Sequence, residues 1–205
     1  KHVAKNVKLS QEINATTYMS LDLNRKSVNE LCKSKSKYYN LSVTLFDLIL
    51  FEISKTLEEF PLLNSYLDKD EIIQNTNVNV SFTVDRGNDL FMPVIKNLNF
   101  KNQNEIILEK FNLIRKIYTN EIMSEDLSGG TISIATISHE DIKNHYPIIF
   151  PKQSCIIGIG SLNNSKNNLI SDDLIGLTIA YDHRLINGNY SSGFISKLLN
   201  NLEKN

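Results

Sequence analysis

The sequence predicts a single α/β domain in which a mixed β-sheet is backed by helices. Three observations support this fold class: strand-like and helix-like segments are interspersed along the chain, no internal repeat is present, and no linker-like stretch divides it. The 205 residues suit one domain with a full-sized core, and 41% hydrophobic with 22% charged residues is typical of globular rather than disordered chains.

The first part of the chain is expected to form a strand and two helices. Alternating β-branched and aromatic residues predict a strand over 15–23, and Asn24 is a candidate N-cap for a helix over residues 26–35. The strongest helical segment spans 41–60, and its early turns are apolar around most of their circumference, which predicts a buried helix. Pro61 ends this helix, because proline cannot continue the helical hydrogen bonds.

Short strands are predicted next, over 71–73, 78–84 and 90–95. The turn between the last two falls at 85–89. Pro93 has no amide hydrogen to donate, so the strand that contains it is expected to be an edge strand or to contain a bulge.

A helix over residues 104–119 is expected to precede two further strands, at 128–137 and 154–160. The first of these strands is entered through two glycines, and the glycines of the second indicate close approach of another backbone. The inner face of the helix is expected to comprise Ile106, Ile107, Phe111, Ile114, Ile117 and Tyr118.

The last part of the chain brings a histidine to the end of a strand. The polar tract 163–168 predicts a hairpin loop, and a strand over 174–181 then runs into a turn at 182–188. Helical spacing of apolar residues predicts a helix over 189–202. His183 therefore lies on a short turn between strand and helix, where a rigid scaffold holds it and it can face a cavity.

Composition narrows the function classes. A net charge of −1 argues against a general nucleic-acid binder, and no apolar run approaches the length of a membrane span. Neither Cys32 nor Cys155 has a Cys or His at metal-ligand spacing, so no metal is expected and both are interpreted as reduced thiols in a reducing compartment. Cys155 is either a packed core residue or a catalytic one. A chain that begins with Lys1 is interpreted as a segment of a longer one.

The turn at 182–188 resembles the His-Arg-x-x-Asp-Gly signature of the acyltransferase component of 2-oxo acid dehydrogenase complexes, whose superfamily includes chloramphenicol acetyltransferase. Four further stretches match the family in the same order. The stretch 80–95 resembles its Ala-Val-Asp…Gly-Leu-x-x-Pro-Val-Ile hairpin. The others are 60–68, 129–134 and 151–160.

This resemblance implies a chloramphenicol acetyltransferase-like fold and a homotrimer, which can belong to a larger core. Active sites would lie between neighbouring subunits, with coenzyme A entering from one side and a lipoyl arm from the other. Coenzyme A would be a substrate, the lipoyl group would come from another domain, and no tightly bound cofactor is expected. The lipoyl and subunit-binding domains of such chains have no counterpart in residues 1–205.

His183 is the candidate general base. A thiol with a pKa near ~8.5 is mostly protonated at neutral pH, so acyl transfer between thiols needs a base, and imidazole titrates close to that pH. Asn187 lies where the family has Asp or Asn, and would hold the turn and polarise the site. Arg184 either braces the turn or is a plain surface residue, Asp182 is assigned a structural role, and Gly188 completes the motif.

Ala135 is the serious departure from the family pattern, because a serine there would stabilise the tetrahedral oxyanion. Thr136 is adjacent but points to the opposite face of a regular strand, unless a bulge brings it round, and Ser133 shares the face of Ala135 two residues away. Losing one oxyanion donor costs about 2.7–4 kcal/mol of transition-state stabilisation.

Substrate contacts are expected from Phe91, Met92 and Pro93, and Phe82 and Tyr181 could also shape the acyl pocket. The loop at 85–87 could contact the phosphates of coenzyme A, although a hairpin turn without a ligand is the alternative. The remaining histidines are His2, His139 and His145, and solvated positions are expected for all three.

Three functions remain open from the sequence. The first is an acyltransferase between dihydrolipoamide and coenzyme A, which His183, Arg184 and Gly188 favour. The second is a related acyltransferase that acts on a carrier protein in a biosynthetic pathway. The third is an impaired homologue that serves as a trimeric, partner-binding scaffold, which Ala135 favours. For the enzyme, we expect the cytoplasm or the interior of a mitochondrion or plastid.

Overall fold

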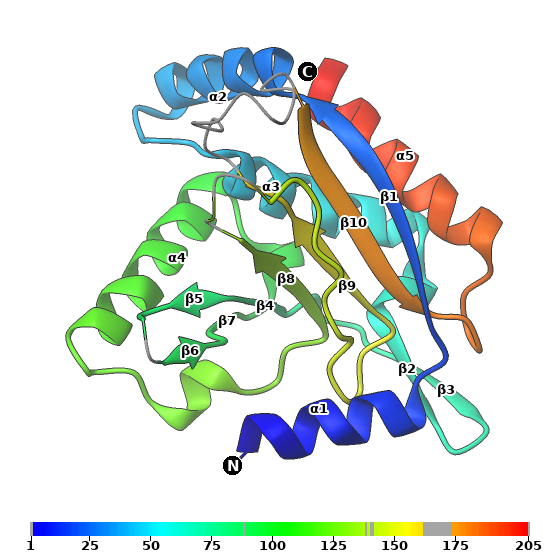
Figure 1. Ribbon diagram of the computed structural model, residues 1–205. Coiled ribbons are helices and arrows are strands. Elements are labelled where there is room, and N and C mark those ends of the chain that lie inside the picture. The colour runs from blue at the N-terminus through cyan, green and yellow to red at the C-terminus, as the bar shows by residue number, and fades with distance from the viewer. Residues whose placement is uncertain (1, 88, 138, 140–141, 162–173, 205) are drawn as a thin grey trace.

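A six-stranded mixed sheet runs through the molecule in the order β1-β10-β9-β8-β4-β7 (Figure 1). The computed structural model describes residues 2–204 except 88, 138, 140–141 and 162–173, and side chains between 8 and 202. β8 is parallel to β4 and β9, and the other pairs are antiparallel, so the predicted mixed sheet is confirmed. The strands are β1 Thr16–Asn24, β4 Val80–Phe82, β7 Val94–Ile95, β8 Ile132–Thr136, β9 Cys155–Ile159 and β10 Leu174–Asp182.

The main core lies between one face of this sheet and four helices. Inward-facing residues of the strands, such as Ile134, Ile157 and Ile179, share one buried cluster with residues of the helices. Burying such side chains stabilises the fold by about 1.5–3 kcal/mol each. The helices are α2 Arg25–Tyr39, α3 Leu45–Glu59, α4 Gln103–Tyr118 and α5 Gly188–Lys204.

Side-chain caps fix where these helices begin. Asn24 accepts from the backbone amide of Ser27 at 3.0 Å, which confirms it as the cap of α2. The helix expected over 41–60 begins only at Leu45, because Thr44 and Asp47 form a capping box at its N-terminus. Pro61 opens a short 3-10 helix, η1 Pro61–Asn64, and does not continue α3.

α4 buries a different stripe from the one predicted. Ile106 and Ile117 are buried as expected, but Phe111 and Tyr118 are 65% and 59% exposed, and Leu113 is buried instead. Helical periodicity allowed either stripe, and packing against the sheet selected the one that carries Leu113.

Pro93 divides the strand predicted over 90–95. Its carbonyl accepts from the amide of Phe82, but the residue itself lies between β6 Leu90–Phe91 and β7. β7 is an edge strand of the main sheet, as the proline predicted. β6 pairs instead with β5 Val84–Asp85, so the strand expected over 78–84 is also divided, at Thr83.

Four further elements were not predicted as such. Helix α1 His2–Ile13 precedes β1, and a two-stranded ribbon pairs β2 Ser65–Asp68 with the expected β3 Glu71–Gln74. Two short 3-10 helices, η2 Leu98–Phe100 and η3 Ser124–Leu127, connect the elements around α4. The polar tract 163–168 lies outside the described residues.

The second face of the sheet is covered by the loop 143–150, which lies close to the backbone of β9 and β10. A Cβ atom added at Gly158 would lie 3.0 Å from the carbonyl oxygen of His145, and one at Gly160 would overlap the carbonyl oxygen of Lys143. The close backbone approach predicted from these glycines is confirmed. Within the described part of the chain, helices long and apolar enough for a membrane span are absent.

Candidate active site

His183 stands immediately after β10, on the turn that leads into α5. Its backbone amide donates to the carbonyl of Ala15 at 2.9 Å, which ties the turn to the residue before β1. The side chain is exposed, and its ring lies 5.8 Å from that of buried Tyr181. The imidazole is therefore held on a fixed backbone while it remains open to solvent.

A carboxylate–guanidinium pair braces this turn. Asp182 is 1% exposed, and it accepts from Nε and Nη2 of Arg184, the latter at 2.5 Å. The same carboxylate accepts from the backbone amides of Ala15 and Arg184. Hydrogen bonding to Asp182 raises the pKa of Arg184. These contacts match the bracing role considered for Arg184 and the structural role expected of Asp182.

Asn187 caps the helix that follows the histidine. Its side-chain oxygen accepts from the amide of Tyr190 at 2.9 Å, and its carbonyl accepts from the amide of Ser191. α5 begins at Gly188. Asn187 thus fixes the second end of the turn that carries His183.

Ser133 and Thr136, the two residues considered as replacements for the missing serine hydroxyl, are poorly placed to donate to an oxyanion. Ser133 is fully buried, and its hydroxyl is 2.6 Å from that of Ser81 and donates to Oε1 of Gln153 at 2.6 Å. Thr136 is adjacent in a regular strand, and its neighbours in register show no bulge at this point. Neither side chain lines the pocket beside Ala135.

An apolar pocket lies against the second face of the sheet at Ala135. Of the three residues expected to contact substrate, Met92 lines this pocket, and Phe91 and Pro93 do not. Phe91 packs against the main core and the guanidinium of Arg86. The other lining residues are Ser10, Thr83, Leu90, Tyr146, Pro147, Ile148, Ile149, Phe150 and Ile156.

Phe82 and Tyr181, which could have shaped the acyl pocket, belong to the main core on the other face of the sheet. Thr83 is the functional candidate that sequence reasoning missed. The signal was the strand register: Phe82 lies beside Ile134, so the next pair in sequence is Thr83 and Ala135.

His183 and Ala135 are far apart within one copy of the chain. In the sheet, Ala135 is level with Gly158 and Thr178 on the next two strands. His183 lies five residues beyond Thr178, which corresponds to about 16 Å along β10 and about 10 Å across two strand spacings, or about 19 Å in all. Groups that contact one thioester must lie within roughly 10 Å of each other, because each is about 3 Å from a reacting atom.

The loop at 85–87 has the contacts of a ligand-free hairpin. Arg86 donates through Nη1 to the carbonyl of Ile117 and to the side chain of Asn120, both at 2.7 Å. Its second terminal nitrogen lies 3.5 Å from Asp89. The arginine thus joins this hairpin to the C-terminal end of α4.

The remaining histidines differ from one another. His139 is exposed as expected, and the side chain of His2 lies outside the described residues. The solvated position expected for His145 is wrong: both ring nitrogens are shielded from solvent without a hydrogen-bond partner, and burial lowers the pKa of the ring. The loop 143–150 packs so closely on the sheet that it carries this ring inward.

Both cysteines are free thiols. Cys155 is buried and donates to the carbonyl of Leu63, and burial raises its pKa strongly, so it is a core residue and not a nucleophile. Burial and the nearby Asp47 raise the pKa of Cys32 to about 11. Groups of three or more His, Cys, Asp or Glu side chains able to hold a metal ion are absent from the described residues.

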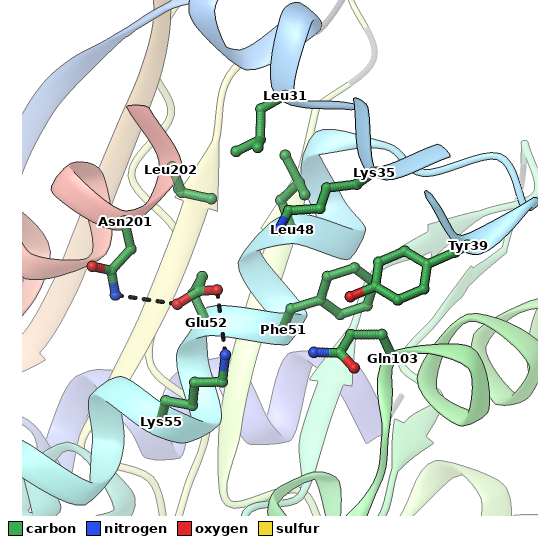
Figure 2. A pocket seen from close by; sticks show the side chains of 10 residues that line it. All are labelled: Leu31, Lys35, Tyr39, Leu48, Phe51, Glu52, Lys55, Gln103, Asn201 and Leu202. Atoms are coloured by element: carbon green, nitrogen blue, oxygen red, sulfur yellow. Dashed lines mark hydrogen bonds and ion pairs between the residues drawn. The ribbon is translucent and has the colours of Figure 1, made fainter. Parts of the chain in front are cut away.

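Figure 2 shows a separate pocket where α2, α3 and α5 meet. Glu52 accepts from Asn201 at 3.1 Å and lies 3.7 Å from Lys55, so its carboxylate is shared between α3 and α5. None of the predicted site residues lines this pocket. Its polar groups join helices, and it is not a candidate for acyl transfer.

Comparisons with known proteins agree with this fold. The family model described as "2-oxoacid dehydrogenases acyltransferase (catalytic domain)" matches residues 1–205. The dihydrolipoyllysine-residue acetyltransferase component of the pyruvate dehydrogenase complex of Rickettsia felis is 30% identical over 209 residues, which cover 96% of this chain and 50% of that protein. The chain therefore spans about half the length of the curated relatives it matches.

Two solved structures bear on the fold. A probable dihydrolipoamide acetyltransferase from Listeria monocytogenes superimposes with a TM-score of 0.85 at 26% identity, over 99% of this chain and 90% of the other. Chloramphenicol acetyltransferase superimposes with a TM-score of 0.55 at 11% identity, over 97% of this chain and 94% of the other, which shows a shared fold only. The chloramphenicol acetyltransferase-like architecture expected from the sequence is confirmed.

Proposed function

Because the chain belongs to the family of 2-oxoacid dehydrogenase acyltransferase catalytic domains, we propose that it transfers an acyl group between dihydrolipoamide and coenzyme A. The observation that carries this proposal is the exposed His183 on a turn braced by Asp182, Arg184 and Asn187. A base positioned in this way contributes about 10²–10⁴-fold in rate.

The chain's own residues account for the proton transfers. His183 takes the proton from the thiol of coenzyme A, and the resulting thiolate attacks the carbonyl carbon of the acyl-dihydrolipoamide thioester. The carbonyl π electrons move to oxygen, which gives a tetrahedral oxyanion. When the carbon–sulfur bond to dihydrolipoamide breaks, the leaving sulfur takes the proton back from His183. The exchange needs no oxidant and no metal ion.

The active site is proposed to form between two copies of the chain in a homotrimer. The separation of about 19 Å between His183 and Ala135 in one copy supports this arrangement, since one thioester cannot contact both. A solved structure with this fold is the cubic core of a pyruvate dehydrogenase multienzyme complex, which supports a larger assembly of trimers. The partners would be a lipoyl domain and coenzyme A, with neither group tightly bound.

A reducing compartment suits this reaction, because dihydrolipoamide and coenzyme A both react as thiols. Both cysteines of the chain are free, and the Rickettsia felis relative is a bacterial protein, which supports the cytoplasm.

The test is acyl transfer from acyl-dihydrolipoamide to coenzyme A by the purified trimer and by His183→Ala. We expect the variant to lose about 10²–10⁴-fold in kcat. His139→Ala, which removes another exposed imidazole, is the matched control and should retain activity. Equal turnover by His183→Ala and the parent protein would refute the role of His183.

Ala135 supports one alternative function, a scaffold without catalysis. A folded trimer that shows no turnover with acyl-dihydrolipoamide, but binds a lipoyl domain, would favour the scaffold. Turnover only with an acyl group attached to a carrier protein would favour the biosynthetic relative. The same two variants are used in both assays, so the outcomes are directly comparable.

A further inference from the structure

Ala135 lacks a hydroxyl at the position where the family resemblance implies a serine that donates to the oxyanion. The neighbouring strand has a hydroxyl at the same level of the sheet, on Thr83. We infer that Thr83 is the oxyanion donor of this chain, so that the hydroxyl has moved from β8 to the end of β4. The inference rests on the proposed function, because a donor has a role only if a thioester carbonyl is attacked.

The side chains of Thr83 and Ala135 share one face of the sheet. β4 and β8 are parallel, with Ser81 beside Ser133 and Phe82 beside Ile134. The hydroxyls of Ser81 and Ser133 lie 2.6 Å apart on the second face, and Phe82 and Ile134 both point into the main core. Alternation along each strand then carries the next pair to the second face. Both of its members line the apolar pocket.

Hydrogen bonds hold the Thr83 hydroxyl in place and leave its proton available. The amide of Thr136 donates to Oγ1 of Thr83 at 2.9 Å, where the regular parallel ladder would use a backbone carbonyl. A hydroxyl that accepts in this way still has one proton to donate. Among the described residues, its one acceptor is Oγ1 of Thr136 at 3.4 Å, a long contact that an oxyanion would outcompete.

The other hydroxyls near Ala135 are less suitable. Ser133 is committed to Ser81 and Gln153. Ser10 lines the pocket, but its hydroxyl donates to the carbonyl of Ile149. Tyr146 also lines the pocket, but it is 54% exposed and its ring packs edge-on against Tyr18 of β1, which is three strands from β8.

The sequence pattern agrees with an exchange of hydroxyls. The hairpin that begins at Thr83 resembles the family's Ala-Val-Asp, so this chain has a hydroxyl where the pattern has alanine. At Ala135 it has alanine where the pattern has serine. One hydroxyl has been lost and one gained at directly neighbouring positions of two paired strands.

The experiment measures kcat and KM for acyl transfer to coenzyme A by the trimer and six variants. Thr83→Val removes the hydroxyl at nearly constant volume, and Thr83→Ser keeps it. Thr83→Ala also removes it, and the double variant that adds Ala135→Ser moves it back to β8. Thr136→Val tests the adjacent hydroxyl. Ser81→Ala is the matched control, because it removes a hydroxyl from the same face two residues earlier.

We expect Thr83→Val to lower kcat by about 10²–10³-fold with KM little changed, as for loss of one oxyanion donor. Thr83→Ser should keep kcat within tenfold, and the double variant should recover at least tenfold over Thr83→Ala. That recovery distinguishes a donor from a structural residue, since the Thr136 amide stays unpaired in the double variant. Ser81→Ala and Thr136→Val should stay within threefold of the parent.

Four results would overturn the inference. Unchanged kcat in Thr83→Val, with His183→Ala inactive, would remove Thr83 while leaving the proposed function intact. A loss in Thr83→Val without recovery in the double variant would assign Thr83 a structural role. An equal loss in Thr136→Val would transfer the role to that residue. No turnover by the parent trimer would overturn the proposed function and this inference together. If Thr83→Val fails to fold, Thr83→Ser and the double variant decide between these outcomes.

Discussion

The buried carboxylate of Asp182 offers a sharp test of how the turn at His183 is stabilised. Asp182→Ala removes the acceptor for the amides of Ala15 and Arg184 and for the guanidinium of Arg184. Breaking a buried ion pair costs about 3–5 kcal/mol, but Arg184 is 39% exposed and is rehydrated when its partner is lost. The two amides left without an acceptor cost about 1–3 kcal/mol each. We therefore expect the free energy of unfolding to fall by about 2–4 kcal/mol.

The assay is equilibrium unfolding in urea, combined with a double-mutant cycle that adds Arg184→Ala. Asp182→Asn keeps the shape and one acceptor oxygen, so it should cost about half as much as the alanine variant. The matched control is Asp22→Asn, which breaks the exposed pair of Asp22 with Lys143 at 2.7 Å and should cost no more than about 1 kcal/mol.

Kinetics connect this pair to function. The amide of His183 donates to Ala15, whose own amide donates to Asp182, so loss of the carboxylate should loosen the imidazole as well as the fold. kcat should therefore fall in Asp182→Ala even under conditions where the variant is fully folded. A coupling energy below about 0.5 kcal/mol in the cycle, or an unfolding midpoint equal to that of the parent, would refute the reasoning.

Two further predictions concern pH and assembly. Burial lowers the pKa of His145 in the folded state, so the unfolded chain binds a proton more tightly than the folded protein does. The free energy of unfolding should therefore be constant above the unfolded pKa of about 6.5 and should fall as the pH drops below it. Urea unfolding midpoints measured at several pH values should depend less on pH in His145→Gln than in the parent protein, whereas His139→Gln should behave like the parent. An equal pH dependence in all three proteins would contradict this prediction. The variants His183→Ala and Thr83→Val should each have little activity alone, but should recover about a quarter of parental activity when they are mixed in equal amounts, unfolded and refolded together. In such mixed trimers, one site in four combines an intact histidine from one copy with an intact threonine from its neighbour. A mixture as inactive as its components would count against a site shared between copies.

The fold was largely predictable because its local signals are strong. Asn24 marks a helix start, Pro93 marks an edge strand, and the glycines of β9 mark a close backbone contact, each for a reason that needs no tertiary information. Phe111 shows where such reasoning stops. Which apolar residues of a helix become buried depends on the surface that the helix packs against, and the position of that surface depends on the whole sheet.

The site was less predictable than the fold, because it depends on register. The motif at 182–188 locates His183 and its supporting residues, since all of them are close in sequence. Thr83 and Ala135 are separated by more than fifty positions, and only strand pairing brings them side by side. His145 was misjudged for a related reason: its polar loop is carried onto the sheet by glycines that belong to other strands.

The position of Thr83 also follows from which strands can supply a side chain next to Ala135. β8 has two neighbours, β4 and β9, and the residue of β9 beside Ala135 is Gly158. A Cβ atom there would overlap the hydroxyl of Thr178 and lie 3.0 Å from the carbonyl oxygen of His145, so this position cannot carry a donor. β4 remains as the one neighbouring strand with room for a hydroxyl at this level of the sheet. A chain that loses the serine on β8 and keeps the chemistry therefore has a single adjacent position at which to restore it, and this chain has a threonine there.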